Sequence, residues 1–62
     1  MSTLRRIEQF LRRTGMPATR FGAEAVRDPR LVHDLRKGRE PGERMTRRVE
    51  RFMNIYEGKI AQ

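Results

Sequence analysis

The chain has 62 residues, of which 15 are lysine or arginine and 8 are aspartate or glutamate, so its formal net charge at pH 7 is +7. This length predicts one small domain over residues 1–62, with a core so small that its stability is marginal without a partner. The chain has no cysteine, which excludes disulfides, zinc–thiolate sites and thiol nucleophiles. No apolar run is long enough for a membrane-spanning helix or a signal peptide, so we expect a cytoplasmic protein with no membrane partner.

The basic residues are almost all arginine, with lysine only at Lys37 and Lys59. Arginine offers a planar fork of donors that suits phosphates and guanine edges, whereas lysine is a compact point charge. A high GC content of the gene is an equally good explanation of the arginine bias, but it does not account for the net positive charge. A polyanionic partner is therefore the leading expectation.

The first predicted helix covers about residues 3–14. Its apolar side chains recur at helical spacing and form one stripe: Leu4, Ile7, Phe10 and Leu11. Ser2 or Thr3 can cap the start of this helix, and Gly15 can supply the left-handed residue that ends it.

A shorter helix is predicted after it, with Pro17 in its first turn and Phe21 and Ala25 on one face. Gly22 lies inside this helix, where glycine costs about 1 kcal/mol relative to alanine. A glycine at such a position indicates that another segment of backbone passes close by.

The third predicted helix, over residues 29–37, has the clearest boundaries. Asp28 suits the N-cap, Pro29 suits the first helical position and Gly38 suits the residue that closes the helix. At about 100° per residue the side chains separate into two faces. The apolar face consists of Leu31, Val32 and Leu35, and the polar face consists of Arg30, His33, Asp34 and Lys37.

The fourth helix is predicted from about residue 43 to about residue 60, after a turn at Pro41 and Gly42. Its apolar side chains are Met45, Val49, Phe52, Met53, Tyr56 and Ile60. A second face carries the arginines Arg44, Arg47, Arg48 and Arg51. Simple solvation is the plainer interpretation of this arginine stripe, and phosphate contact is the alternative.

The apolar face of the fourth helix either packs on the first helix or pairs with a second copy, as in a short coiled coil. A chain of this length cannot readily spare the face, so we expect it to complete the monomer core. Met53 and Ile60 lie at the margin of the face. We therefore predict that they contribute to a homodimer contact.

The second and third helices together match a helix-turn-helix over about residues 17–38, joined by a turn of three residues. Gly22 is the small residue that a tight crossing of the two helices needs, and Val32 and Leu35 are the paired apolar anchors. Residues 19–25 and 28–39 resemble the lambda-repressor-like helix-turn-helix family of the Cro and XRE types. Two features depart from that family's pattern. Its usual glycine at the inter-helix turn is replaced here by Val26 or Arg27. An apolar residue usually follows that glycine, and Arg27 is not apolar. A longer or differently shaped turn would accommodate them.

The resemblance implies an all-α fold, a compact bundle of four or five short helices, with helix 29–37 in the major groove. The base contacts that it implies are Arg30, His33, Asp34 and Lys37, with Arg30 as the bidentate reader of guanine. The phosphate contacts that it implies are Thr19, Arg20, Asp28, Arg36 and Arg39. The plainer alternatives are that His33 is an incidental surface histidine and that Asp34 pairs with Arg30 or Lys37.

We therefore expect a small sequence-specific regulator that binds double-stranded DNA, a repressor from a phage or bacterium, acting as a homodimer on two half-sites. The alternatives are a protein-interaction module, antitoxin-like or polymerase-binding, and a non-specific nucleoid or RNA-binding protein. A single histidine and the absence of phosphate-loop or catalytic motifs argue against an enzyme. We expect no cofactor, no metal ion and no small-molecule substrate.

Overall fold

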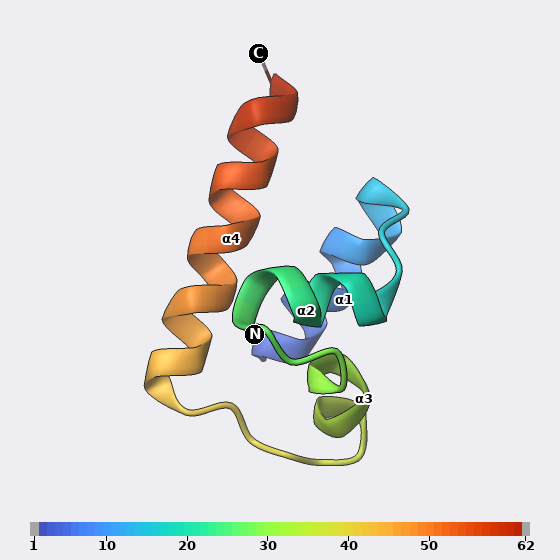
Figure 1. The fold of residues 1–62 in the computed structure, drawn as a ribbon, viewed down its shortest axis with the longest axis vertical. Helices are drawn as coiled ribbons and strands as arrows, with labels where there is room; N and C mark the ends of the chain where they lie inside the picture. The colour runs from blue at the N-terminus through green and yellow to red at the C-terminus, as the bar shows by residue number, and fades with distance from the viewer. Residues whose placement is uncertain (1, 62) are drawn as a thin grey trace.

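The structure is a computed structural model that describes the backbone of residues 2–61 and the side chains of residues 2–58. Within residues 2–61 the chain forms α1 (Thr3–Thr14), α2 (Ala18–Val26), α3 (Leu31–Arg36) and α4 (Glu43–Ala61), and no strand. α2 packs against both α3 and α4, and α1 packs against α3 (Figure 1). The predicted all-α bundle is confirmed, with four helices.

The ends of α1 follow the predicted capping. Ser2 Oγ accepts a hydrogen bond from the Arg5 N–H at 3.2 Å. Gly15 is left-handed, with a φ of 73°, and its N–H donates to the Leu11 carbonyl at 2.9 Å. Because each cap satisfies a backbone group that the helix leaves unpaired, α1 begins and ends where local chemistry dictates.

α3 is shorter than predicted, since it has six residues and begins at Leu31 rather than Pro29. The Leu31 N–H donates to the Asp28 carbonyl at 3.1 Å, three residues back, so the residues before Leu31 form a turn. At the other end Gly38 is left-handed, with a φ of 107°, and its N–H donates to the Leu35 carbonyl at 3.1 Å. The predicted closing role of Gly38 is therefore confirmed, whereas the predicted bounds 29–37 are wrong.

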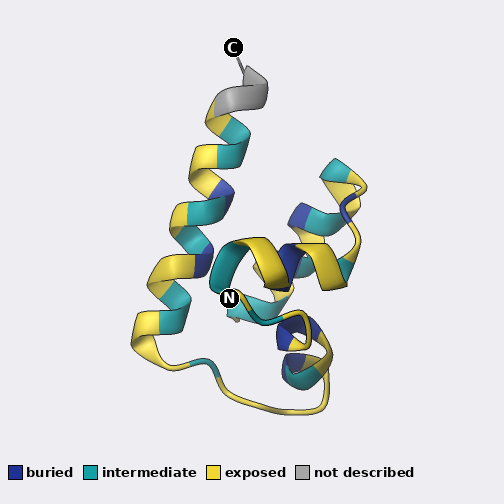
Figure 2. Ribbon diagram, viewed as in Figure 1, coloured by how far each residue is buried: buried dark blue, intermediate teal, exposed yellow. Residues whose placement is uncertain are grey.

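The core is formed by apolar side chains from all four helices and from the α1–α2 connection, as the buried segments in Figure 2 show. Its buried members are Ile7, Phe10, Met16, Phe21, Leu31, Val32, Leu35, Val49 and Met53. Partly buried Met45, Phe52 and Tyr56 of α4 pack against this set. The α4 apolar face therefore completes the monomer core, as predicted.

An aromatic cluster joins three of the helices. The Phe10 ring of α1 lies edge-on to Phe21 of α2, with ring centroids 5.5 Å apart, and to Tyr56 of α4 at 5.4 Å. Phe21 and Phe52 have ring centroids 5.4 Å apart. Edge-to-face pairs of this kind add about 0.5–1.5 kcal/mol each beyond the area they bury.

The two residues predicted for a dimer contact have different outcomes. Met53 is only 6% exposed and belongs to the core, which argues against it as a contact for a second copy. Ile60 lies outside the residues whose side chains the structure describes. None of the described helices combines the length and the apolar character needed to cross a membrane.

Candidate nucleic-acid interface

The crossing of α2 and α3 depends on Gly22. A methyl group placed on this residue would lie 2.2 Å from the Asp28 carbonyl oxygen and 3.1 Å from Leu31 Cβ. The Gly22 carbonyl itself accepts a hydrogen bond from the Asp28 N–H at 3.0 Å. The close approach of backbone that the sequence predicts at Gly22 is therefore confirmed, and the approaching segment is the α2–α3 connection.

Arg27 ends α2 in the left-handed conformation, with φ 58° and ψ 33°. It is the only non-glycine residue with positive φ in the described chain. This conformation favours glycine, because a Cβ atom crowds the following carbonyl. The connection spans residues 27–30, one residue more than the predicted turn of three.

α3 is anchored by its apolar face and presents its polar face to solvent. Leu31 and Val32 are fully buried, and Leu35 is 4% exposed. On the opposite face Arg30, His33 and Lys37 are exposed. Of the predicted base-contact residues, His33 lies within α3, while Arg30 and Lys37 are the capping residues at its two ends, and all three are exposed.

Asp34, the fourth predicted base contact, is engaged within the molecule. Its Oδ2 atom lies 3.3 Å from Arg39 Nη1, and Asp28 Oδ2 lies 3.4 Å from the same nitrogen. Asp34 therefore pairs with Arg39 rather than with Arg30 or Lys37. A cytosine amino group would have to share this carboxylate with Arg39.

Asp28, a predicted phosphate contact, is also satisfied internally. Its Oδ1 atom accepts the Arg30 N–H at 3.0 Å, and its carbonyl accepts the Leu31 N–H. The N–H groups of Arg30 and Leu31, at the start of α3, are thus already bonded. This geometry argues against Asp28 as a phosphate contact.

Two of the predicted phosphate-contact arginines form ion pairs, one between α3 and α1 and the other within α2. Arg36 binds Glu8 of α1 through two hydrogen bonds, of 2.9 Å and 2.6 Å. Arg20 pairs with Glu24, one turn further along α2. These hydrogen bonds raise the pKa of both arginines and, through Arg36, lower the pKa of Glu8. Thr19, beside Arg20, is exposed.

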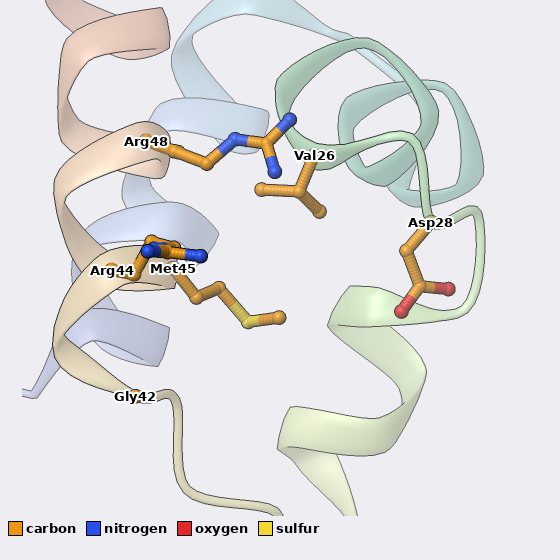
Figure 3. Close-up of a pocket in the computed structure, with 6 residues that line it drawn as sticks. All are labelled: Val26, Asp28, Gly42, Arg44, Met45 and Arg48. Atoms are coloured by element: carbon orange, nitrogen blue, oxygen red, sulfur yellow. The ribbon is translucent and has the colours of Figure 1, made fainter.

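The position of the α4 arginines relative to α2 and α3 could not be predicted from the sequence. In the structure Arg44 and Arg48 line a pocket together with Val26 at the end of α2 and Asp28 of the α2–α3 connection (Figure 3). Arg47 pairs instead with its neighbour Glu43 at 2.6 Å. The sequence indicated this pocket only through the arginine stripe, and nothing in the spacing of the stripe separates Arg44 and Arg48 from Arg47 and Arg51.

The acidic side chains partition the arginines into two groups. Among the described residues, ion pairs engage Arg6, Arg13, Arg20, Arg36, Arg39 and Arg47. No ion pair is found within the described residues for Arg27, Arg30 and Lys37, or for Arg44 and Arg48. The unpaired positive charge therefore lies on the α2–α3 connection, at the two ends of α3 and at the start of α4, and also at Arg5, Arg12 and Arg51, which likewise have no ion pair among the described residues.

No protein-family model, curated protein or solved structure matches the sequence. What the interface can bind is therefore argued from its geometry and charge. Those features are a tightly crossed helix pair, an exposed basic face on the second helix and unpaired arginines beside it.

Proposed function

We propose that this chain is a sequence-specific regulator, a repressor of the lambda-repressor-like helix-turn-helix type, that inserts α3 into the major groove of double-stranded DNA. The observation that carries the proposal is the orientation of α3. Its apolar face is buried against the domain, while Arg30, His33 and Lys37 are exposed together on the other face. A helix held in this way presents one row of side chains, as groove recognition requires.

The chemistry of the exposed face suits base edges. Arg30 offers a planar donor fork for guanine O6 and N7, and such a bidentate contact discriminates against other bases by about 1–3 kcal/mol. His33 and Lys37 follow about one and two turns later, so they reach successive positions of a site. Asp34 pairs with Arg39, and in this proposal it would share its carboxylate with a cytosine amino group.

Thr19, Arg20, Arg36 and Arg39 are the proposed phosphate contacts. Each of these arginines is exposed and pairs with a carboxylate in the structure. A guanidinium has five N–H donors, so an arginine that holds a carboxylate keeps further donors for a phosphate oxygen. Contacts of this kind orient the protein on the duplex but do not read its sequence.

A binding selection from random duplex DNA tests the proposal. The wild type is expected to enrich one sequence, and two symmetric half-sites about one helical turn apart would identify a homodimer on DNA. In the double variant Arg30→Ala/Lys37→Ala, the preference for that sequence over random duplex should fall by at least about tenfold, the loss of roughly one good base contact.

The matched control is Arg5→Ala/Arg12→Ala, which removes the same charge from exposed arginines of α1. It should bind almost as tightly as the wild type and keep the preferred sequence. An unchanged preference in Arg30→Ala/Lys37→Ala refutes α3 as the reading helix. Equal affinity for all duplexes favours a non-specific nucleic-acid binder. No duplex binding at about 50 mM salt, where counterion release favours association, favours a module that binds an acidic protein.

A further inference from the structure

A pocket of about 370 Å³ lies between the α2–α3 connection and the start of α4. Its lining residues are Val26, Asp28, Gly42, Arg44, Met45 and Arg48. In Figure 3 Arg48 and Met45 extend from α4 toward Val26 across the gap. Two apolar side chains and two guanidinium groups therefore line the same space.

The charge in this pocket is predominantly positive. Arg44 and Arg48 form no ion pair with any described residue, unlike Arg47, which binds Glu43 on the same helix. The one carboxylate of the pocket, Asp28, is already occupied by the Arg30 N–H and by the Arg39 guanidinium. An incoming anion therefore meets two arginines without an ion pair and one carboxylate whose negative charge is largely compensated.

We propose that this pocket binds one sugar-phosphate unit of the DNA backbone, with the phosphate between Arg44 and Arg48 and the deoxyribose against Val26 and Met45. The inference rests on the proposed function, because it requires duplex DNA at α3. A deoxyribose phosphate combines one anion with a small ring of largely apolar surface, which matches the contents of the pocket. An acidic side chain of a protein would use the arginines but supplies no such ring.

The position of the pocket supports a backbone contact. Asp28 lines it and lies two residues before Arg30, so the pocket borders the N-terminal end of α3. The major groove is about 12 Å wide and is walled by the two phosphate strands. A helix in that groove therefore has a sugar-phosphate strand beside it, and α4 supplies arginines on that side.

This assignment divides the arginine stripe of α4 by function. Arg44 and Arg48 bind phosphate, whereas Arg47 and Arg51 face solvent away from the pocket lining. Two phosphate contacts contribute about 1.8 to the slope of log K against log salt concentration, at about 0.9 per contact. That contribution is independent of base sequence.

The test is a salt titration of binding to the selected duplex, made with Arg44→Gln/Arg48→Gln and with the control Arg5→Gln/Arg12→Gln. Both pairs are exposed arginines without ion partners among the described residues, so each variant loses the same charge and is expected to fold. Circular dichroism checks that the helix content is retained. The pocket variant should lower the slope by about 1.8, which makes the loss of affinity between about 50 and 200 mM salt roughly tenfold smaller.

The control should leave the slope close to that of the wild type, and the pocket variant should keep the preferred sequence. Equal slopes for the pocket variant and the wild type overturn the pocket assignment alone. Equal reductions in both variants also overturn it, since they show a general charge effect. If the wild type prefers no sequence and only the pocket variant has a reduced slope, the pocket assignment is supported and base reading by α3 is refuted. A wild type that binds no duplex overturns both proposals.

Discussion

Gly22 is the residue on which the placement of α3 depends most directly. Any larger side chain there would push the Asp28 carbonyl away, and Asp28 in turn holds the Arg30 N–H, the Leu31 N–H and the Arg39 side chain. A glycine inside a helix is normally a weakness, because it leaves more backbone freedom to the unfolded chain. Here the missing methyl group allows the second helix to cross closely.

Gly22→Ala is expected to destabilise the fold by roughly 1–3 kcal/mol, because forcing a methyl group against backbone outweighs the gain in helix propensity. The matched control is Gly58→Ala in α4, where an added methyl group meets nothing within 4 Å. That variant should instead gain up to about 1 kcal/mol. Urea unfolding of both variants measures the effect, and a stabilised Gly22→Ala would contradict the close approach.

Arg27 adopts the backbone conformation of the α2–α3 turn although it is not a glycine. Val26 or Arg27 occupies the place where glycine is common in the family that the sequence resembles. The structure gives Arg27 the left-handed conformation that glycine would adopt most easily. The connection therefore forms in spite of this residue, held by the Asp28 hydrogen bonds on its far side.

At the scale of elements, α3 is held by more than its apolar face. Its last turn is tied to α1 by the two hydrogen bonds between Arg36 and Glu8. Gly38 then ends the helix, and the Arg39 N–H donates back to the Asp34 carbonyl at 3.0 Å. A helix of six residues has too few hydrogen bonds to persist alone, so these tertiary contacts determine its orientation.

The Glu8–Arg36 pair predicts a pH dependence of stability. The hydrogen bond from Arg36 holds the pKa of Glu8 below its usual value of 4.5 in the folded state. The unfolded state therefore binds the proton more tightly, so this stabilisation is complete above the ordinary glutamate pKa. It is lost as the pH falls through the lowered folded pKa. Glu8→Gln should be less stable than the wild type at about pH 6, and the difference should shrink at about pH 3.

Chemical denaturation at the two pH values measures that difference. Glu40→Gln is the matched control, since Glu40 is exposed and has no ion pair among the described residues. It should differ little from the wild type at either pH. A Glu8→Gln deficit of equal size at both pH values would show that the effect is packing rather than the ion pair.

At the scale of the whole molecule, the aromatic cluster connects helices that are distant in the sequence. Phe10 is fully buried and contacts the rings of Phe21, Phe52 and Tyr56. Ion pairs reinforce the same junction from outside, where Arg6 pairs with Glu50 and Arg13 with Glu57. These contacts couple α1 to the C-terminal helix, which carries the proposed phosphate pocket at its other end.

Phe10→Ala is expected to cost about 3–5 kcal/mol, since it leaves a cavity at the centre of the cluster. A domain of this size has only about 3–9 kcal/mol of total stability, so the variant should lose roughly a third or more of it and unfold at a markedly lower temperature. Ile55→Ala is the control, because Ile55 is 51% exposed. Its effect should stay within about 0.5 kcal/mol. Thermal unfolding followed by circular dichroism separates the two, and equal midpoints would contradict the central role of Phe10.

The local features of this protein are encoded by short stretches of its sequence. The caps at Ser2, Gly15 and Gly38, the small residue at Gly22 and the apolar stripes were all readable, because each depends on neighbours within a few residues. The polar row on α3 follows from the same periodicity. These features were sufficient to predict an all-α bundle with a helix-turn-helix.

Only the tertiary structure decided which charges remain available. Arg6 and Glu50 are 44 positions apart, as are Arg13 and Glu57, while Arg36 and Glu8 are 28 apart. No local pattern encodes such pairs, because they form only after the core has set the helix orientations. The same packing brought Arg44 and Arg48 to the α2–α3 connection and withdrew Met53 into the core. Long-range pairing thus engages part of the positive charge and leaves the rest, Arg30, Lys37, Arg44 and Arg48 among it, without a carboxylate partner in the described part of the chain.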